Sequence, residues 1–417
     1  MKNFLKPLLK PNNLLLLLVF VLAIFVRFYN FPNRVTFWSE QARSLIVSGN
    51  YIKEKPTLLG QEYFRVDSRG HKMFSGAIFN YSLVPMLLIA NYDPVVITSF
   101  FVILNLLTGV VLYVFVKRMV NQKVALASFV LFSFNDYMIY HSLFIWNYNY
   151  LPLIGVFTIY ISYLNIKSKS AKYLLYLGLI SGLGISLQVL YIPIMFFVLG
   201  INAYKKRLDF KGLVLFVLGL TIGNLPMVLF DLRHDFYHLR TISQYLVDTF
   251  VGRSDAGLAY YYFLPFWPLL AIIGGWLLSK LNNTSSLLFV LAYLYVNLSS
   301  PLISWNSPTG MPNGLTVYDI EMASSAISAD ANSEFNVSEV LDFDKRAYVI
   351  RYFVQFRNNK KILGDEVYNN LKLLYVLSQK DYNIEDSDIW EIKVGSPYKV
   401  SKLTDVGHGY MIYKLTK

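Results

Sequence analysis

The chain has 417 residues, of which 55% are hydrophobic, 17% aromatic and only 15% charged. This apolar excess excludes an ordinary soluble globular protein and indicates a polytopic α-helical membrane protein. The formal net charge of +12 does not indicate nucleic-acid binding, because the basic residues lie largely between apolar segments, where they set topology and meet anionic membrane lipids. The chain has no cysteine, so a disulfide framework is excluded as well.

The first apolar segment, Leu14 to Val26, follows three lysines, as the start of a secretory signal peptide would. No small-residue cleavage site follows it, and Arg27-Phe28-Tyr29 is bulky. We therefore predict a retained first span whose basic flank keeps the N-terminus in the cytoplasm.

Eight further apolar segments have roughly the length that a bilayer requires. They lie at about 94–116, 124–138, 148–166, 173–187, 189–204, 212–230, 257–279 and 285–304. Basic residues separate them at 117–123, 167–172, 205–211 and 280, which places these loops on the cytoplasmic side with the N-terminus. The sequence thus predicts about nine transmembrane helices in the plasma membrane.

The apolar segment from Ser75 to Ala90 does not fit this count, because a crossing there would move Lys117 and Arg118 to the outer side. We predict an interfacial or re-entrant helix, which Pro85 also favours. Residues 30–91 then form one long outer loop that holds most of the ionisable residues near the first span. A loop of this length indicates a function.

The composition becomes polar after residue 304. We predict a transmembrane module over residues 1–304 and a small extracytoplasmic α/β domain over residues 305–417, long enough for a core of its own. Hydrophobic patterning predicts a helix from Asp319 to Asp330 and four strands. The strands are expected at Ala347–Gln355, Leu373–Ser378, Trp390–Val394 and Tyr410–Leu415.

Glu40 and Arg43, in Trp38-Ser39-Glu40-Gln41-Ala42-Arg43, follow the first span and its aromatic flank. A carboxylate at the membrane surface can accept a proton from an incoming hydroxyl or amine, or hold a divalent cation such as Mg²⁺ or Mn²⁺. The alternative is an exposed structural ion pair, since Glu and Arg three residues apart often pair on a helix surface.

Two other predicted outer segments carry polar groups on the same face as Glu40. The first holds Asp136, a candidate second acid and metal ligand, and the candidate sugar-binding residues Trp146, Asn147 and Asn149. The second is Asp231-Leu232-Arg233-His234, where Arg233 and His234 are candidates for binding a phosphate. Trp146 can equally be an interfacial anchor, and Arg233 and His234 a charged helix end.

Such groups suit a glycosyl transfer on the outer face. Nucleotide sugars are cytoplasmic, so the natural donor on that face is a polyprenyl-phosphate-linked sugar. The acceptor is not indicated by the sequence.

Five motifs, in order and at similar spacing, resemble those of the polytopic GT-C glycosyltransferases. The likeness is greatest to the bacterial and archaeal branch related to protein O-mannosyltransferases and lipid A aminoarabinose transferases. The matching segments are Glu40-Gln41-Ala42-Arg43, Leu58-Leu59-Gly60 with 75–81, Trp146-Asn147-Tyr148-Asn149, Gly182-Leu183-Gly184 with Gln188 and Tyr191, and Phe230-Asp231-Leu232-Arg233-His234.

The resemblance covers most of the chain and implies the GT-C fold, a lipid-phosphate sugar donor and an inverting displacement at the anomeric carbon. It implies that Glu40 is the catalytic or metal-binding acid and that Arg43, Gln188 and Asp231 take part in substrate binding. The sequence departs from the family pattern at Glu40, which replaces an Asp, and at Tyr148, which replaces a Pro.

Two other classes stay open at this point. A transporter or lipid flippase usually carries ionisable residues deep within its spans, whereas here they collect at one membrane face. A catalytically inactive envelope scaffold of the same fold would keep every motif but lack transfer activity.

Overall fold

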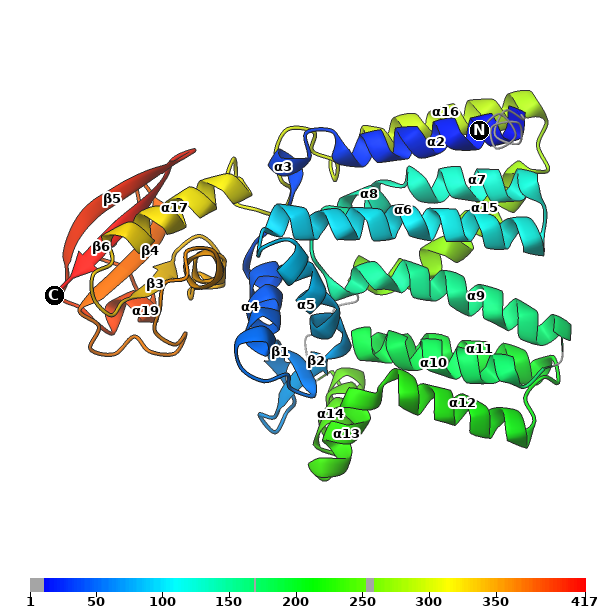
Figure 1. The fold of residues 1–417 in the computed structure, drawn as a ribbon, viewed down its shortest axis with the longest axis horizontal. Coiled ribbons are helices and arrows are strands. Elements are labelled where there is room, and N and C mark those ends of the chain that lie inside the picture. The colour runs from blue at the N-terminus through cyan, green and yellow to red at the C-terminus, as the bar shows by residue number, and fades with distance from the viewer. Residues whose placement is uncertain (1–10, 169, 253–258) are drawn as a thin grey trace.

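The chain folds into a bundle of apolar helices with a mixed α/β unit beyond one end (Figure 1). This computed structural model describes residues 11–168, 170–252 and 259–417. The bundle helices lie side by side along one direction (Figure 1). They are α2 (Pro11–Phe28), α6 (Pro94–Met119), α7 (Gln122–Ser133), α9 (Leu151–Ser168), α10 (Lys172–Leu187), α11 (Ile192–Tyr204), α12 (Phe210–Gly223), α15 (Trp267–Leu278) and α16 (Asn283–Leu298).

Three helical stretches among the described residues are long and apolar enough to cross a membrane: 94–119, 147–168 and 260–280. A fourth is added if the bent pair α12 and α13 (Leu225–Arg233) counts as one span. The remaining apolar helices have 10–17 residues, less than a bilayer ordinarily requires. The helical membrane character is supported, and the count of about nine crossings stays a prediction.

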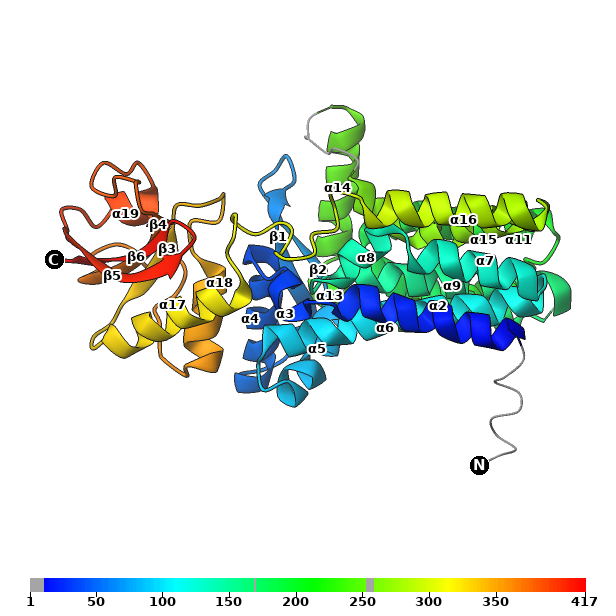
Figure 2. The same cartoon turned by 90° about the horizontal axis from the view of Figure 1, so that it is seen from above.

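The segment expected as one span at 212–230 is not one straight helix. The chain bends by 85° between α12 and α13. The break falls at Asn224, just before Pro226, whose ring cannot donate the hydrogen bond that would continue α12. As a result α13 and the following α14 (Tyr237–Phe250) stand crosswise at the end of the bundle (Figure 2).

The first outer loop builds the same end of the molecule. It contains α3 (Phe31–Arg34), α4 (Ser39–Lys53), an antiparallel hairpin of β1 (Leu59–Val66) and β2 (Lys72–Gly76), and α5 (Ile78–Ile89). The predicted short helix is present as α5, and its interfacial placement stays a prediction. The hairpin is fastened to α14, because the Ser68 N–H donates to Asp248 Oδ2 at 3.0 Å.

The basic residues lie at the other end of the bundle. Lys117 and Arg118 occupy the last turn of α6, and Lys167 that of α9. Both helices end on the side away from α4 (Figure 1). This separation agrees with the predicted topology, whose orientation in a membrane stays a prediction.

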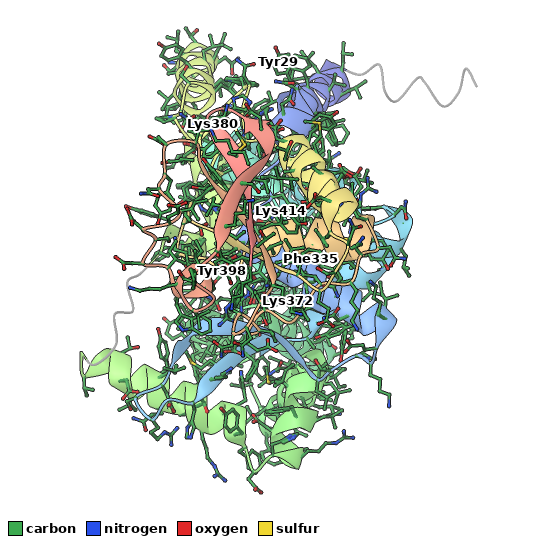
Figure 3. All side chains as sticks on the ribbon, turned by 90° about the vertical axis from the view of Figure 1, so that its left-hand side faces the viewer. Tyr29, Phe335, Lys372, Lys380, Tyr398 and Lys414 are labelled. Carbon is green, nitrogen blue, oxygen red and sulfur yellow. The ribbon has the colours of Figure 1, made fainter. Side chains whose placement is uncertain are left out.

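Residues 317–417, here called the C-terminal unit, form a four-stranded sheet with helices against it (Figure 3). Its elements are α17 (Val317–Asp330), β3 (Asn336–Glu339), α18 (Tyr348–Tyr352), the helical turn η4 (Phe353–Arg357), β4 (Leu373–Gln379), α19 (Trp390–Lys393), β5 (Lys399–Gly407) and β6 (Tyr410–Thr416). The strand order is β3-β4-β6-β5, with β3 parallel to β4 and the other pairs antiparallel.

Three of the five predicted elements in this unit are confirmed, namely α17, β4 and β6. The strands predicted at 347–355 and 390–394 are wrong, because both segments are helical. The first is a run of apolar residues buried on every side, including Val349, Ile350 and Phe353. A short run without an exposed face cannot be assigned to helix or strand by its periodicity.

Candidate active site

Glu40 lies in the first turn of α4, at the end of the bundle that faces the C-terminal unit (Figure 1). The backbone N–H of Trp38 donates to Gln41 Oε1 at 3.0 Å, which fixes the start of the helix. The exposed N–H groups of a helix start attract negative charge. The helix start thus contributes one influence that favours the ionised form of the Glu40 carboxyl group.

The surroundings of Glu40 act on its pKa in opposite directions. Burial raises the pKa above the ordinary value of 4.5, while the Arg43 guanidinium and a hydrogen bond from the Trp146 side chain lower it. Burial dominates, so the pKa is raised. A carboxylate of raised pKa binds a proton more strongly than a solvated one, which suits a general base.

Arg43 is held on two further sides. Its Nη2 donates to the backbone oxygen of Glu62 in β1 at 3.3 Å. Its guanidinium carbon lies 5.2 Å from the ring centre of Tyr348, at the start of α18. The Glu40–Arg43 pair is therefore enclosed between the first outer loop and the C-terminal unit, and it is not the solvated surface pair of the structural alternative.

An aromatic cluster surrounds Glu40; its members are Tyr63, Trp146, Tyr148, Tyr261 and Tyr262. The ring centre of Trp146 lies 4.4 Å from that of Tyr148 and 4.7 Å from that of Tyr261. Burial raises the pKa of Tyr63, and the nearby Tyr262 and Glu40 act in the same direction. Rings of this kind can pack against a sugar while their polar edges stay available.

The three candidate amides form hydrogen bonds that hold the segments around this cluster in place. Asn147 Nδ2 donates to the backbone oxygen of Leu187 at 2.5 Å, and Asn149 Nδ2 donates to that of Phe144 at 2.7 Å. Gln188 Nε2 donates to the Tyr148 hydroxyl at 2.7 Å. All three amides are buried and have partners within the protein, which fixes the loop that carries Trp146.

A buried histidine stacks against the Trp146 ring. His141, in α8 (Asp136–Ser142), stacks on the Trp146 ring with centres 5.8 Å apart and planes 12° apart. Burial lowers the pKa of His141 to about 3. The imidazole is therefore neutral at physiological pH and places no charge next to the Glu40–Trp146 contact.

A cavity of about 260 Å³ adjoins the cluster between β2, the end of α10, α13 and α14. Its lining is mostly apolar and includes Tyr63 of the cluster together with Val228 and Ile242. Gly76 forms part of the wall, where a Cβ atom would stand 2.4 Å from the backbone oxygen of Ser186. Tyr63 therefore lies both in the cavity lining and near Glu40, which is not itself among the lining residues.

The Asp231–His234 motif lies at the rim of this cavity. Asp231 is among the lining residues, and its Oδ1 accepts from the backbone N–H of His238 at 2.8 Å, where it caps α14. Arg233 and His234 are exposed and are not among the lining residues, and His234 Nδ1 lies 2.8 Å from the backbone oxygen of Phe230. Their predicted binding of phosphate stays a prediction.

Asp136, the other candidate acid, begins α8. Its Oδ1 accepts from the N–H of Tyr137 at 2.8 Å, and its own N–H donates to Asn297 Oδ1 at 2.9 Å. Within the described ranges no group of three His, Cys, Asp or Glu side chains converges as a metal site. A divalent cation at Glu40 would have one carboxylate beside a guanidinium, a donor set that does not fit Mg²⁺ or Mn²⁺.

Sequence reasoning did not select Tyr63, Tyr261, Tyr262 or His141 for the site. The triplet Tyr260-Tyr261-Tyr262 at the start of a predicted span was a signal that could have indicated part of the cluster. Tyr63 lies among the polar residues of the first outer loop, and no pattern there distinguishes it.

The sequence of the chain matches no protein-family model and no curated protein. Its structure is similar to that of ArnT from Cupriavidus metallidurans bound to undecaprenyl phosphate, with a TM-score of 0.64 and 10% identity over 96% of this chain and 97% of that one. The apo state of the same protein gives a TM-score of 0.57 at 9% identity, with the same coverage of both chains.

A weaker likeness joins the chain to the Archaeoglobus fulgidus oligosaccharyltransferase in complex with Zn and sulfate. The TM-score is 0.45 at 11% identity, over 89% of this chain and 68% of that one. The ArnT comparison covers both the helical bundle and the C-terminal unit and confirms the fold that the sequence motifs imply. The chain thus has the fold of ArnT.

Proposed function

We propose that this protein is an inverting membrane glycosyltransferase, which moves a sugar from a polyprenyl-phosphate-linked donor to an acceptor on the extracytoplasmic face. The observation that carries the proposal is the environment of Glu40, a partly buried carboxyl group beside Arg43 and Trp146 and near Tyr63, which also lines an apolar cavity. The shared fold supports it, since one ArnT structure holds undecaprenyl phosphate.

The cavity accounts for the lipid part of the donor. Its mostly apolar wall lies at the end of the helical bundle and reaches the aromatic cluster at Tyr63. An isoprenoid chain that enters from the membrane would bury its apolar surface there. The sugar would then pack against the rings of Trp146 and Tyr148, next to Glu40.

The reaction follows from these positions. The Glu40 carboxylate accepts the proton of the acceptor hydroxyl or amine while the acceptor atom attacks the anomeric carbon. The bond from that carbon to the phosphate oxygen breaks, and polyprenyl phosphate leaves as the anion. The Arg43 guanidinium lies close enough to Glu40 to lower its pKa. Its positive charge can stabilise the negative charge that develops on the phosphate. No step in this proposal passes through a metal ion, because the residues around Glu40 do not fit one.

The experiment that tests the proposal compares membranes containing the protein with membranes lacking it. Both are given a set of labelled polyprenyl-phosphate sugars and endogenous acceptors. Label that enters an acceptor together with release of polyprenyl phosphate is the expected result. Labelled substrate that enters vesicles without release of polyprenyl phosphate would favour a transporter, and an absence of both would favour a scaffold; either would refute the proposal.

A further inference from the structure

The start of α4 is held by a second group of acids, in the loop that follows β3. The Trp38 indole N–H donates to Asp342 Oδ2 at 2.5 Å, across 304 positions in the sequence. The next residue, Ser39, lies near the Asp344 carboxylate, and its Oγ has no hydrogen-bond partner among the described residues. Trp38 and Ser39 are both buried and directly precede Glu40. The C-terminal unit therefore contacts the chain one and two residues before the candidate base.

Hydrogen bonds within the loop that carries these acids hold it in one conformation. Asp342 Oδ1 accepts from the N–H of Asp344 at 2.5 Å. Asp344 accepts from the N–H groups of Arg346 at 3.3 Å and Tyr348 at 3.4 Å. Hydrogen bonds from aspartate to the following backbone hold a turn in one shape. The two carboxylates are thus presented to α4 from a fixed frame.

Further contacts keep α4 and the C-terminal unit in register. Besides the Arg43–Tyr348 contact, Lys53 Nζ at the other end of α4 donates to the backbone oxygen of Gln355 at 3.1 Å. The space beside Gly49 is filled by Phe356, so that a Cβ there would meet the ring at 2.4 Å. The whole length of α4 therefore packs on the segment 348–356.

The charged side chains around Asp342 are mostly acidic, which favours a hydrogen-bond donor there. Glu339 and Asp344 are buried with Asp342 nearby, and burial raises the pKa of both Glu339 and Asp344. Lys345 is the cation of the group, and its Nζ donates to the backbone oxygen of Asp342. The Trp38 indole N–H adds a hydrogen-bond donor to this acid-rich site.

We propose that Asp342 is a positioning residue, which fixes Trp38 and thereby holds Glu40 at the distance from the aromatic cluster that transfer requires. The inference rests on the proposed function of Glu40. It assigns the C-terminal unit a part in building the catalytic site, in addition to covering it. A displacement of about 1 Å at a reacting group lowers rates by up to about a hundredfold.

Kinetics of Trp38→Phe, Asp342→Asn and the double variant test the proposal. Each single variant is expected to lower kcat about tenfold, in the range of such displacements, with KM for the donor and bound undecaprenyl phosphate per molecule unchanged. The double variant should be no slower than the slower single variant, because both changes affect one hydrogen bond. Asp388→Asn is the matched control, since Asp388 is 95% exposed in the same unit.

Hydrogen exchange gives a second readout that does not depend on sugar transfer. In wild-type protein and Asp388→Asn, the amides of residues 39–45 should exchange equally slowly, while Asp342→Asn should speed their exchange and leave α17 unchanged. This result would support the positioning role even if the wild type transferred no sugar, in which case only the proposed function fails. Unchanged exchange at 39–45, or kinetic effects of the two variants that multiply fully, would overturn the proposal.

Discussion

Two motifs that the sequence assigns to one site have different surroundings in the structure. The segment Trp146–Asn149 is largely buried near Glu40, and the side-chain nitrogens of Asn147 and Asn149 donate to backbone oxygens of the protein. The segment Asp231–His234 lies in the turn after an 85° bend, where Asp231 caps α14 and Arg233 and His234 face outward. Two motifs of polar and aromatic residues thus differ in their surroundings: Trp146–Asn149 is enclosed, whereas Arg233 and His234 lie on an exposed rim.

The difference shows that motifs with similar residue types can differ in enclosure, and the proposed reaction is assigned to the enclosed one. Glu40, Tyr63 and Trp146 come from three separate segments and influence one another through a partly dehydrated space. In such a space charges interact more strongly than in water. Arg233 is screened by solvent, so its effect on a reacting group should be smaller.

Replacement of Arg43 by Gln should have the largest effect among the residues around Glu40. We expect transfer to fall about a hundredfold, since the loss of one preorganised charge or donor at a developing anion typically has this size. The measurement is kcat/KM for donor consumption. Arg69→Gln, a change at a half-exposed arginine of the same outer loop, is the control. An Arg43→Gln enzyme with full activity would place the phosphate elsewhere.

Replacement of Trp146 by Phe keeps the ring and removes the N–H that donates to Glu40. We expect transfer to fall about tenfold, as for a misplaced general base. The Trp146 hydrogen bond lowers the pKa of Glu40, so its loss should raise that pKa further. Glu40 acts as a base only when ionised, so the acidic limb of the rate profile should lie above pH 4.5 in the wild type and move to higher pH in the variant.

The control for this shift is Trp276→Phe on α15, where the indole is 47% exposed on the outer face of the bundle. Its pH profile should match that of the wild type. An acidic limb that moves to lower pH in Trp146→Phe would contradict the assigned hydrogen bond.

Replacement of Val228 by Trp fills the cavity between α13 and α14. Binding of undecaprenyl phosphate should weaken about tenfold, because the larger side chain takes the place of buried ligand methylenes, each worth about 0.8 kcal/mol. Calorimetry in detergent measures the affinity. Val217→Trp, on the exposed face of α12, should bind as the wild type does. Equal affinity in both variants would remove the cavity from donor binding.

The smallest effect is expected at the exposed rim. Arg233→Gln and His234→Gln should each change kcat/KM by less than about threefold, as solvent-screened charges do. The same transfer assay, run at low and high salt, gives the comparison. A loss as large as that of Arg43→Gln would support the sequence prediction that Arg233 and His234 hold the phosphate.

The sequence was sufficient for the fold, while its choice of Glu40 as the centre of the site stays a prediction. Ordered motifs led to the GT-C fold, and the position of Glu40 after the first span and its aromatic flank singled it out. The hydrogen bonds that Asn147, Asn149 and Gln188 make within the protein could not be predicted, because an amide with a partner in the protein looks the same in sequence as one that binds a sugar. Their predicted part in substrate binding stays a prediction. The helix at 348–352 was missed for a related reason, since complete burial removes the exposed face that distinguishes helix from strand.

The contact between Trp38 and Asp342 was also invisible in the sequence. It joins segments about three hundred residues apart, and only the packing of the C-terminal unit on α4 brings them together. A lone Trp before a predicted helix start carries no sign of its distant partner.

The measurement that tests the central claim most directly is transfer of label from a polyprenyl-phosphate sugar by wild type, Glu40→Gln and Glu54→Gln at matched expression. Glu54 is exposed at the far end of the same helix and serves as the control. We predict that Glu40→Gln loses at least about a hundredfold in rate, as expected for the loss of a general base, while Glu54→Gln retains the wild-type rate. Equal rates in all three proteins would contradict the account and remove Glu40 from the chemistry.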